Sequence, residues 1–242
     1  MPVIVFASSK GGAGKTTACI VLACELAKQG YEKNMTISII DADPNQHSAS
    51  WGCLENTPTN IKLFKNVTED NILDSIEQAS KESEFILVDL EGVSSNAVTY
   101  ATSQADLVIV PCQASQNDAK EAIKTIKMIK TNSKMLKREI PFSIIFTRLS
   151  AAIITKTAKH LSLEFERLNI DTFSTALIER EAFRSIFSFG GSISTLESKN
   201  NKSKESINKT ALNAKAFSDE VKSKLKKIIL GSRLKEEAIN NG

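Results

Sequence analysis

A short glycine-rich stretch near the N-terminus carries the residues best suited to chemistry. It reads Ser9-Lys10-Gly11-Gly12-Ala13-Gly14-Lys15-Thr16-Thr17 and lies between an apolar run and a helix with apolar periodicity. Glycines let the backbone turn where a side chain would clash, and the N–H groups of such a turn point inward at an anion. The start of the following helix adds positive potential. The order of strand, glycine-rich turn and helix therefore predicts a cradle for phosphate groups.

The charged and hydroxyl side chains of this loop have separate expected roles. Lys15 is the cation expected at the outer phosphates of a nucleotide, the Thr16 hydroxyl is placed to ligate Mg²⁺, and Thr17 can donate to an inner phosphate. The ordinary pattern has glycine at position 9, where this chain has Ser9. It also has a second lysine, Lys10, which is either a solvated loop residue or a group that reaches the phosphates of a second subunit.

The run from Lys10 to Thr17 resembles the signature loop of the ParA/MinD family of deviant Walker-A ATPases. The resemblance extends from Val3 to about Leu230 and is of the short ParA type, with VirC-like features. It implies an ATPase that binds ATP and Mg²⁺ and closes with ATP into a sandwich homodimer, in which Lys10 acts in trans. The loop residues expected around the nucleotide are Lys10, Gly11, Gly12, Ala13, Gly14, Lys15, Thr16 and Thr17.

Three aspartates follow predicted strands. Asp89 comes directly after the apolar residues 85–88, as a Walker-B aspartate does, and would hold Mg²⁺ beside Thr16. By resemblance, Asp43 orients the attacking water and Asp41 lies near the Mg²⁺ shell. Each aspartate has a plainer alternative, since such residues also begin turns or cap helices.

Two arginines are candidates for the base side of the nucleotide. Arg148 ends a predicted strand after Thr147, as the family's adenine-side motif does, and Arg180 lies in a segment similar to the one that passes the base. Both are equally compatible with surface ion pairs.

The composition suits one α/β domain over residues 1–242, because hydrophobic residues make up 41% and charged residues 24% of the chain. Apolar runs alternate with helical periodicity, which predicts a mostly parallel twisted sheet with helices on both faces, a P-loop NTPase fold. We expect strands at residues 3–7, 37–40, 61–64, 85–88, 107–111 and 142–146, an extended segment at 172–178, and helices at 16–28, 70–79, 118–129, 155–168 and 208–230. Residues 198–208 are expected to form a flexible loop.

The small net charge of +3 is unevenly distributed, because the region of about 199–242 is markedly basic. A basic helical surface of this kind is suited to the phosphate backbone of DNA, without sequence specificity, although a solvated helix face gives the same pattern. The candidate DNA-binding residues are Lys199, Lys202, Lys204, Lys222, Lys224, Lys226 and Lys227. The four cysteines form no metal-type or redox-type close pair and are expected to be reduced packing thiols. No export signal or spanning segment is visible, so we expect a cytoplasmic protein.

These features together predict a Mg²⁺-dependent ATPase for plasmid or chromosome segregation. The ATP-bound homodimer would bind DNA non-specifically on the nucleoid. A centromere-binding, ParB-like adaptor would stimulate the slow hydrolysis that resets it. One alternative is a VirC-like accessory ATPase for conjugative DNA transfer. Another is a MinD-like, membrane-recruited regulator anchored through the apolar stripe Phe217, Val221, Leu225 and Ile228/Ile229. A core-facing helix gives the same stripe, and no stable membrane insertion is expected. A third is an ATP-driven redox or metal-cluster protein on the same fold. It would need cysteines arranged across a dimer face, and Cys53 and Cys112 are not recognisably so placed.

Overall fold

The computed structural model describes residues 1–92, 96–150, 156–196 and 200–240, with the backbone alone from 233 to 240. Its centre is a seven-stranded sheet of order β3-β2-β4-β1-β5-β6-β7, in which every pairing is parallel. This confirms the predicted fold class. The strands are β1 (Val3–Phe6), β2 (Ile37–Ala42), β3 (Ile61–Phe64), β4 (Phe85–Leu90), β5 (Leu107–Gln113), β6 (Phe142–Leu149) and β7 (Leu177–Ile178).

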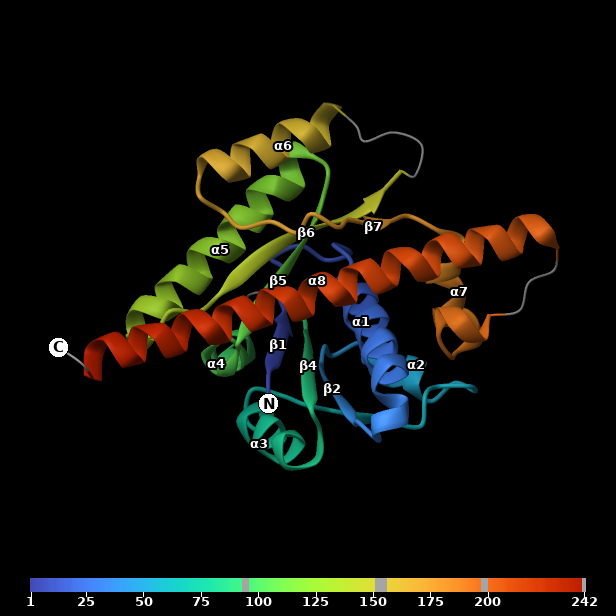
Figure 1. Cartoon of the computed structure of the whole chain (residues 1–242), viewed down its shortest axis with the longest axis horizontal. Helices are drawn as coiled ribbons and strands as arrows, with labels where there is room; N and C mark the ends of the chain where they lie inside the picture. The colour runs from blue at the N-terminus through green and yellow to red at the C-terminus, as the bar shows by residue number, and fades with distance from the viewer. Residues whose placement is uncertain (93–95, 151–155, 197–199, 241–242) are drawn as a thin grey trace.

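Helices cover both faces of this sheet (Figure 1). One face packs against α3 (Ile72–Glu82), α4 (Asn96–Gln104), α5 (Gln116–Leu136) and α6 (Lys156–Arg167). The other packs against α1 (Lys15–Gly30), α2 (His47–Gly52), α7 (Glu181–Phe189) and α8 (Asn201–Asn240). Two short 3₁₀ helices, Tyr31–Lys33 and Ile193–Thr195, complete the described elements. Within the described residues, no helix is long and apolar enough to cross a membrane.

Register brings the ends of the central strands together. Phe6 of β1 lies beside Asp89 of β4, and Asp89 also lies beside Asp41 of β2. Because the strands are parallel, their carboxyl ends share one edge, and the phosphate loop leaves β1 at that edge. The predicted phosphate loop and the strand-end aspartates are therefore neighbours.

Several predicted element boundaries are wrong. Residues 201–208 are the first turns of α8 rather than a flexible loop. Asn200 and Ser203 begin the helix by exchanging hydrogen bonds, with the Ser203 N–H donating to Asn200 Oδ1 at 2.8 Å and the Asn200 N–H donating to Ser203 Oγ at 3.1 Å. Such a reciprocal cap stabilises a helix start that has little apolar periodicity. Of the predicted extended segment 172–178, only β7 is a strand, with one isolated bridge between Thr172 and Ile144.

Three side chains of the apolar stripe of α8 belong to the core. Phe217 and Val221 are fully buried and Leu225 is 4% exposed. The Phe217 ring packs edge-on against Phe173, with the ring centroids 5.6 Å apart. Figure 1 shows α8 running across the sheet beside α1. Because these three side chains are already packed, they are not available as a membrane anchor, whereas Ile229 at the end of the stripe is 44% exposed.

Replacing Phe217 with alanine should therefore lower the free energy of unfolding by about 3–5 kcal/mol, the usual cost of a deleted core aromatic ring. Leu212 lies on the same helix but is 67% exposed, so Leu212→Ala is the matched control and should change stability by less than about 0.5 kcal/mol. Chemical denaturation measures both values. Equal, small effects would contradict the docking of α8 as part of the core.

Candidate functional site

The phosphate loop is held by hydrogen bonds from the elements around it. The Ser9 N–H donates to Thr125 Oγ1 at 3.0 Å, and the Ser9 hydroxyl lies 2.8 Å from Glu121 Oε2. Ser9, which replaces the usual glycine, therefore ties the loop to α5. On the other side, the Thr147 hydroxyl donates to the Ala13 carbonyl at 2.7 Å.

Gly14 has no substitute at the point where the loop enters α1. Its φ is +99°, a conformation that side chains rarely adopt, and a Cβ there would lie 3.4 Å from the Thr147 side chain. This geometry aims the first N–H groups of α1 at the cavity in front of the loop, the usual arrangement for an anion. The loop is thus built as the sequence predicts.

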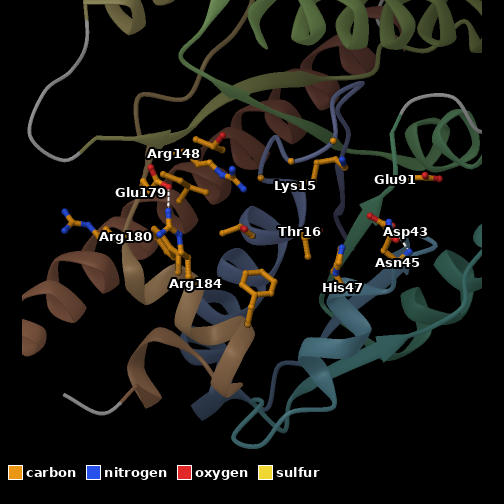
Figure 2. Close-up of a pocket in the computed structure, with 18 of the residues that line it drawn as sticks. Lys15, Thr16, Asp43, Asn45, His47, Glu91, Arg148, Glu179, Arg180 and Arg184 are labelled. Atoms are coloured by element: carbon orange, nitrogen blue, oxygen red, sulfur yellow. Dashed lines mark hydrogen bonds and ion pairs between the residues drawn. The ribbon is translucent and has the colours of Figure 1, made fainter. Parts of the chain in front are cut away.

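The loop opens into a pocket of about 680 Å³ with two chemically different ends (Figure 2). Asp43 and Asn45, between β2 and α2, line one end together with His47, the first residue of α2. The other end combines apolar side chains with the two predicted base-side arginines, and its lining includes Arg148, Ile178, Arg180, Phe183 and Phe187. A nucleotide can therefore place its phosphates on the loop and its base at the apolar end.

The two predicted base-side arginines lie in different structural environments. Arg148 is exposed and lies at an irregularity in the β6–β7 pairing, with a φ of +54°. Arg180 precedes α7 and has a buried Nε without a hydrogen-bond partner in the described structure. The neighbouring Arg184, which sequence reasoning missed, forms an ion pair with Glu179 at the same end of the pocket.

The two loop lysines point to different places. Lys15 is buried and lines the pocket, where its ammonium group has no ion-pair partner among the described residues. Lys10 does not line the pocket. Its Nζ lies 2.9 Å from Oδ1 of Asp118, near the start of α5, and its side chain is 42% exposed. Ser115 Oγ also contacts Asp118, so this carboxylate is held in place from both sides.

Asp89 is fully buried beneath the loop, and its environment fits a metal ligand. Ser48 Oγ donates to its Oδ2 at 2.7 Å, whereas its Oδ1 is buried without a hydrogen-bond partner. Burial raises the pKa of the Asp89 carboxyl from 3.8 to about 6, against the opposing effect of hydrogen bonds from Ser48 and Thr16. A buried carboxylate oxygen that lacks a partner and lies near a threonine hydroxyl suits Mg²⁺.

Asp41 is also fully buried, but both of its oxygens are occupied. Its Oδ2 accepts the Ala49 N–H at 2.7 Å and its Oδ1 accepts the Asp43 N–H at 3.1 Å. Burial raises its pKa and these backbone bonds lower it. In this structure Asp41 anchors the start of α2 and the segment that carries Asp43.

Asp43 faces the pocket with one oxygen available. Its Oδ1 accepts hydrogen bonds from the backbone and side-chain nitrogens of Asn45 at 2.8 and 2.9 Å. Its Oδ2 has no hydrogen-bond partner among the described residues. This arrangement fixes the carboxylate and leaves one oxygen to accept a proton or orient a water molecule.

No group of three or more His, Cys, Asp or Glu side chains in the described residues could hold a metal ion on its own. Thr16 and Asp89 therefore supply only part of an octahedral Mg²⁺ shell, which phosphate oxygens and water complete in nucleotide sites. The protein geometry thus suits a metal that arrives with a nucleotide.

The sequence and fold comparisons agree with this geometry. The family model described as VirC1 protein matches residues 1–231. The chain belongs to the VirC1 protein family. Protein ParA of Rhizobium radiobacter is 34% identical over 225 residues, which are 93% of this chain and 98% of that protein. Protein virC1 of the same organism is 26% identical over 188 residues, covering 76% of this chain and 79% of that one.

Solved structures similar to this VirC1-family protein include those of McdA and MinD proteins. The ATP complex of a Cyanothece McdA variant superposes with a TM-score of 0.71 at 15% identity, covering 91% of this chain and 96% of that one. The MinD cell division protein of Aquifex aeolicus superposes with a TM-score of 0.67 at 16% identity, covering 92% of this chain and 98% of that one. At such low identity these matches establish the fold alone.

The predicted DNA-binding lysines of the VirC1-family chain differ in their exposure and in their ion-pair partners. Lys224 is 16% exposed, pairs with Asp171 at 2.7 Å and lies 4.8 Å from the centre of the Phe173 ring. Lys222 lies 2.8 Å from Asp219 and also contacts Gln29. Lys224 therefore serves packing, whereas Lys222 is 40% exposed and engaged in polar contacts. The exposed members without an ion-pair partner in the described residues are Lys202, Lys204, Lys226 and Lys227, whereas Lys199 lies outside those residues.

The two cysteines considered for the redox alternative lie in different environments. Cys112 is buried within β5 and Cys53 is exposed after α2. Cys19 and Cys24 pack within α1, as expected of packing thiols. Burial raises the pKa of the Cys24 thiol well above its usual value, so this thiol stays protonated and unreactive.

The buried charge of Asp89 predicts a cost to stability in the metal-free protein. An acid with a raised native pKa binds its proton more tightly when folded, so the stability it contributes falls as pH rises from about 4 to about 6 and stays low above that. Asp89→Asn should therefore stabilise the nucleotide-free protein by up to about 3 kcal/mol at pH 8, from two pKa units at 1.36 kcal/mol each.

Thermal unfolding in EDTA at pH 8 and near pH 4 measures this effect, and the gain should shrink at the lower pH. Asp74→Asn, at an exposed aspartate of α3, is the control. A destabilised Asp89→Asn protein at pH 8 would show that the carboxylate is satisfied without a metal.

Proposed function

We propose that this protein is an ATP-dependent DNA-partitioning ATPase. Its ATP-bound homodimer binds DNA without sequence specificity, and slow hydrolysis, stimulated by a DNA-bound adaptor protein, resets it. The observation that carries the proposal is the division of the two loop lysines. Lys15 enters the protomer's own nucleotide pocket, whereas Lys10 stays outside it, paired with Asp118. A loop lysine that its own site does not use is available to a second protomer.

The residues of the pocket divide the reaction between them. The loop N–H groups and Lys15 bind the phosphates, which positions the outer phosphate near Asp43. Asp43, held by Asn45, orients the attacking water through its remaining oxygen. Mg²⁺, held by Thr16 and Asp89, would neutralise charge on the phosphate oxygens. Lys10 from the second protomer adds a further positive charge.

Slow turnover fits this set of groups. Within the described residues, no arginine lies at the Asp43 end of the pocket, and such a residue accelerates phosphoryl transfer by about 10³–10⁵. A long-lived ATP state suits a timer for DNA binding better than a metabolic enzyme. The similarity to protein ParA supports segregation, and the family match to VirC1 protein keeps accessory work in DNA transfer as the second candidate.

The proposal is tested by measuring the solution mass and the DNA binding of the wild type and of Asp43→Asn with ATP and with ADP. Asp43→Asn should keep its ATP affinity, lose at least about 100-fold in turnover and accumulate as a DNA-binding dimer, because only water activation is removed. The wild type should bind DNA with ATP and release it with ADP. Asp74→Asn should behave as wild type. Wild-type turnover by Asp43→Asn, or equal DNA binding with ATP and ADP, would contradict the proposal.

A further inference from the structure

The exposed face of α5 is strongly basic. Between Ala122 and Arg138 the chain has five lysines, one arginine and no acidic residue. Five lysines form what we call the α5 lysine face: Lys120, Lys124, Lys127, Lys130 and Lys134, all of them exposed. The C-terminal helix α8, by contrast, carries Glu205, Asp219 and Glu220 among its lysines.

The α5 lysine face is opposite the helix face that packs on the sheet. At about 100° per residue, its five members lie within about 120° of one another around the helix. The buried side chains, among them Ala122, Ile126 and Ile129, occupy the other side. From Lys120 to Lys134 the face is about 21 Å long.

Most of these ammonium groups are free of acidic partners. Lys124 pairs with Glu121 at 2.6 Å, and Lys130 lies 5.7 Å from the centre of the Phe142 ring. Lys120, Lys127 and Lys134 have no ion-pair partner among the described residues. They recur every seven residues, so they project in nearly the same direction.

We propose that the α5 lysine face binds the phosphate backbone of double-stranded nucleic acid. Duplex DNA carries about one negative charge per 1.7 Å of its axis, so a straight row of lysines about 21 Å long faces many phosphates at once. A membrane surface would require apolar side chains beside the lysines. Those of α5 are buried or partly buried, apart from Met135 and Leu136 at its last turn.

The face begins beside the phosphate loop. Lys10, Gly11, Lys120 and Lys124 line a shallow depression between the loop and α5, and Ser9 is hydrogen-bonded to Glu121. This part of the argument rests on the proposed function. If Lys10 reaches a second protomer's nucleotide, the start of each α5 lies at the dimer contact, and two lysine faces act together only in the ATP state.

The proposal is tested by the salt dependence of duplex DNA binding with a non-hydrolysable ATP analogue. The α5 variant carries Lys127→Gln, Lys130→Gln and Lys134→Gln, and keeps Lys120, which lies beside the phosphate loop. Because each lost phosphate contact lowers the slope of log K against log salt by about 0.9, the slope should fall by about 2–3 for each protomer. ATP affinity and dimer mass are measured alongside and should match the wild type.

The matched control removes the same charge from α8, through Lys204→Gln, Lys226→Gln and Lys227→Gln. It should reduce the slope by less than the α5 variant does. Two results would overturn the assignment to α5 and leave the proposed function intact. One is an unchanged slope in the α5 variant, and the other is a slope that falls in the α8 variant alone. If the α5 variant loses binding to phosphatidylglycerol vesicles but keeps its DNA binding, the α5 lysine face binds a membrane and not nucleic acid.

The proposed function and the α5 assignment fail in different ways. If the wild type binds DNA equally with ATP and ADP, the nucleotide switch fails, but the slope of the α5 variant still reports on the lysine face. If the wild type binds no DNA in any nucleotide state, both proposals are wrong.

Discussion

Three buried aspartates and one buried lysine meet at the carboxyl edge of the sheet, and much of the structure is arranged around that concentration of charge. Asp41 and Asp89 lie side by side on neighbouring strands, Lys15 begins α1, and Asp43 is 8% exposed. Such charges are costly to bury unless each is paired or hydrogen-bonded. Backbone N–H groups satisfy Asp41 completely, whereas Asp89 keeps an unpartnered oxygen. The unpartnered oxygen of Asp89 is the position at which our account places the cation.

The same edge connects the nucleotide pocket to α5. Ser9 and Lys10 both bond to the first turns of that helix, through Glu121 and Asp118. These contacts connect the phosphate loop directly to α5. In our account this connection couples the triphosphate to a nucleic-acid surface, because Lys10 exchanges Asp118 for a phosphate of a second protomer.

The sequence was sufficient to predict the features that follow from local chemistry. The glycine-rich turn, Asp89 after an apolar run and the parallel sheet all depend on short patterns with one physical meaning, and the structure has them in place. It did not reveal the partners of Ser9 and Lys10, because Glu121 and Asp118 lie more than a hundred residues away and no local pattern links them. Asp41 shows a related limit, since its role depends on whether the Ala49 N–H faces it.

The C-terminal region was harder to interpret because charge alone does not report side-chain contacts. Lys224 is a basic residue in the sequence, yet in the structure it packs over Phe173 beside Asp171. The sequence alone does not single out the lysines of α5, because the overall charge is small and the first turns of their helix contain Asp118 and Glu121. Only the burial pattern separates a lysine that packs from one that faces solvent.

The most direct measurement is the solution mass of the Asp43→Asn protein with ATP and Mg²⁺, with and without Lys10→Ala. The account predicts a dimer for Asp43→Asn alone and a monomer for the double variant, with ATP affinity for each protomer retained because Lys10 lies outside its own pocket. A double variant that still dimerises, or one that loses ATP binding as a monomer, would contradict the central claim that this lysine serves the second protomer.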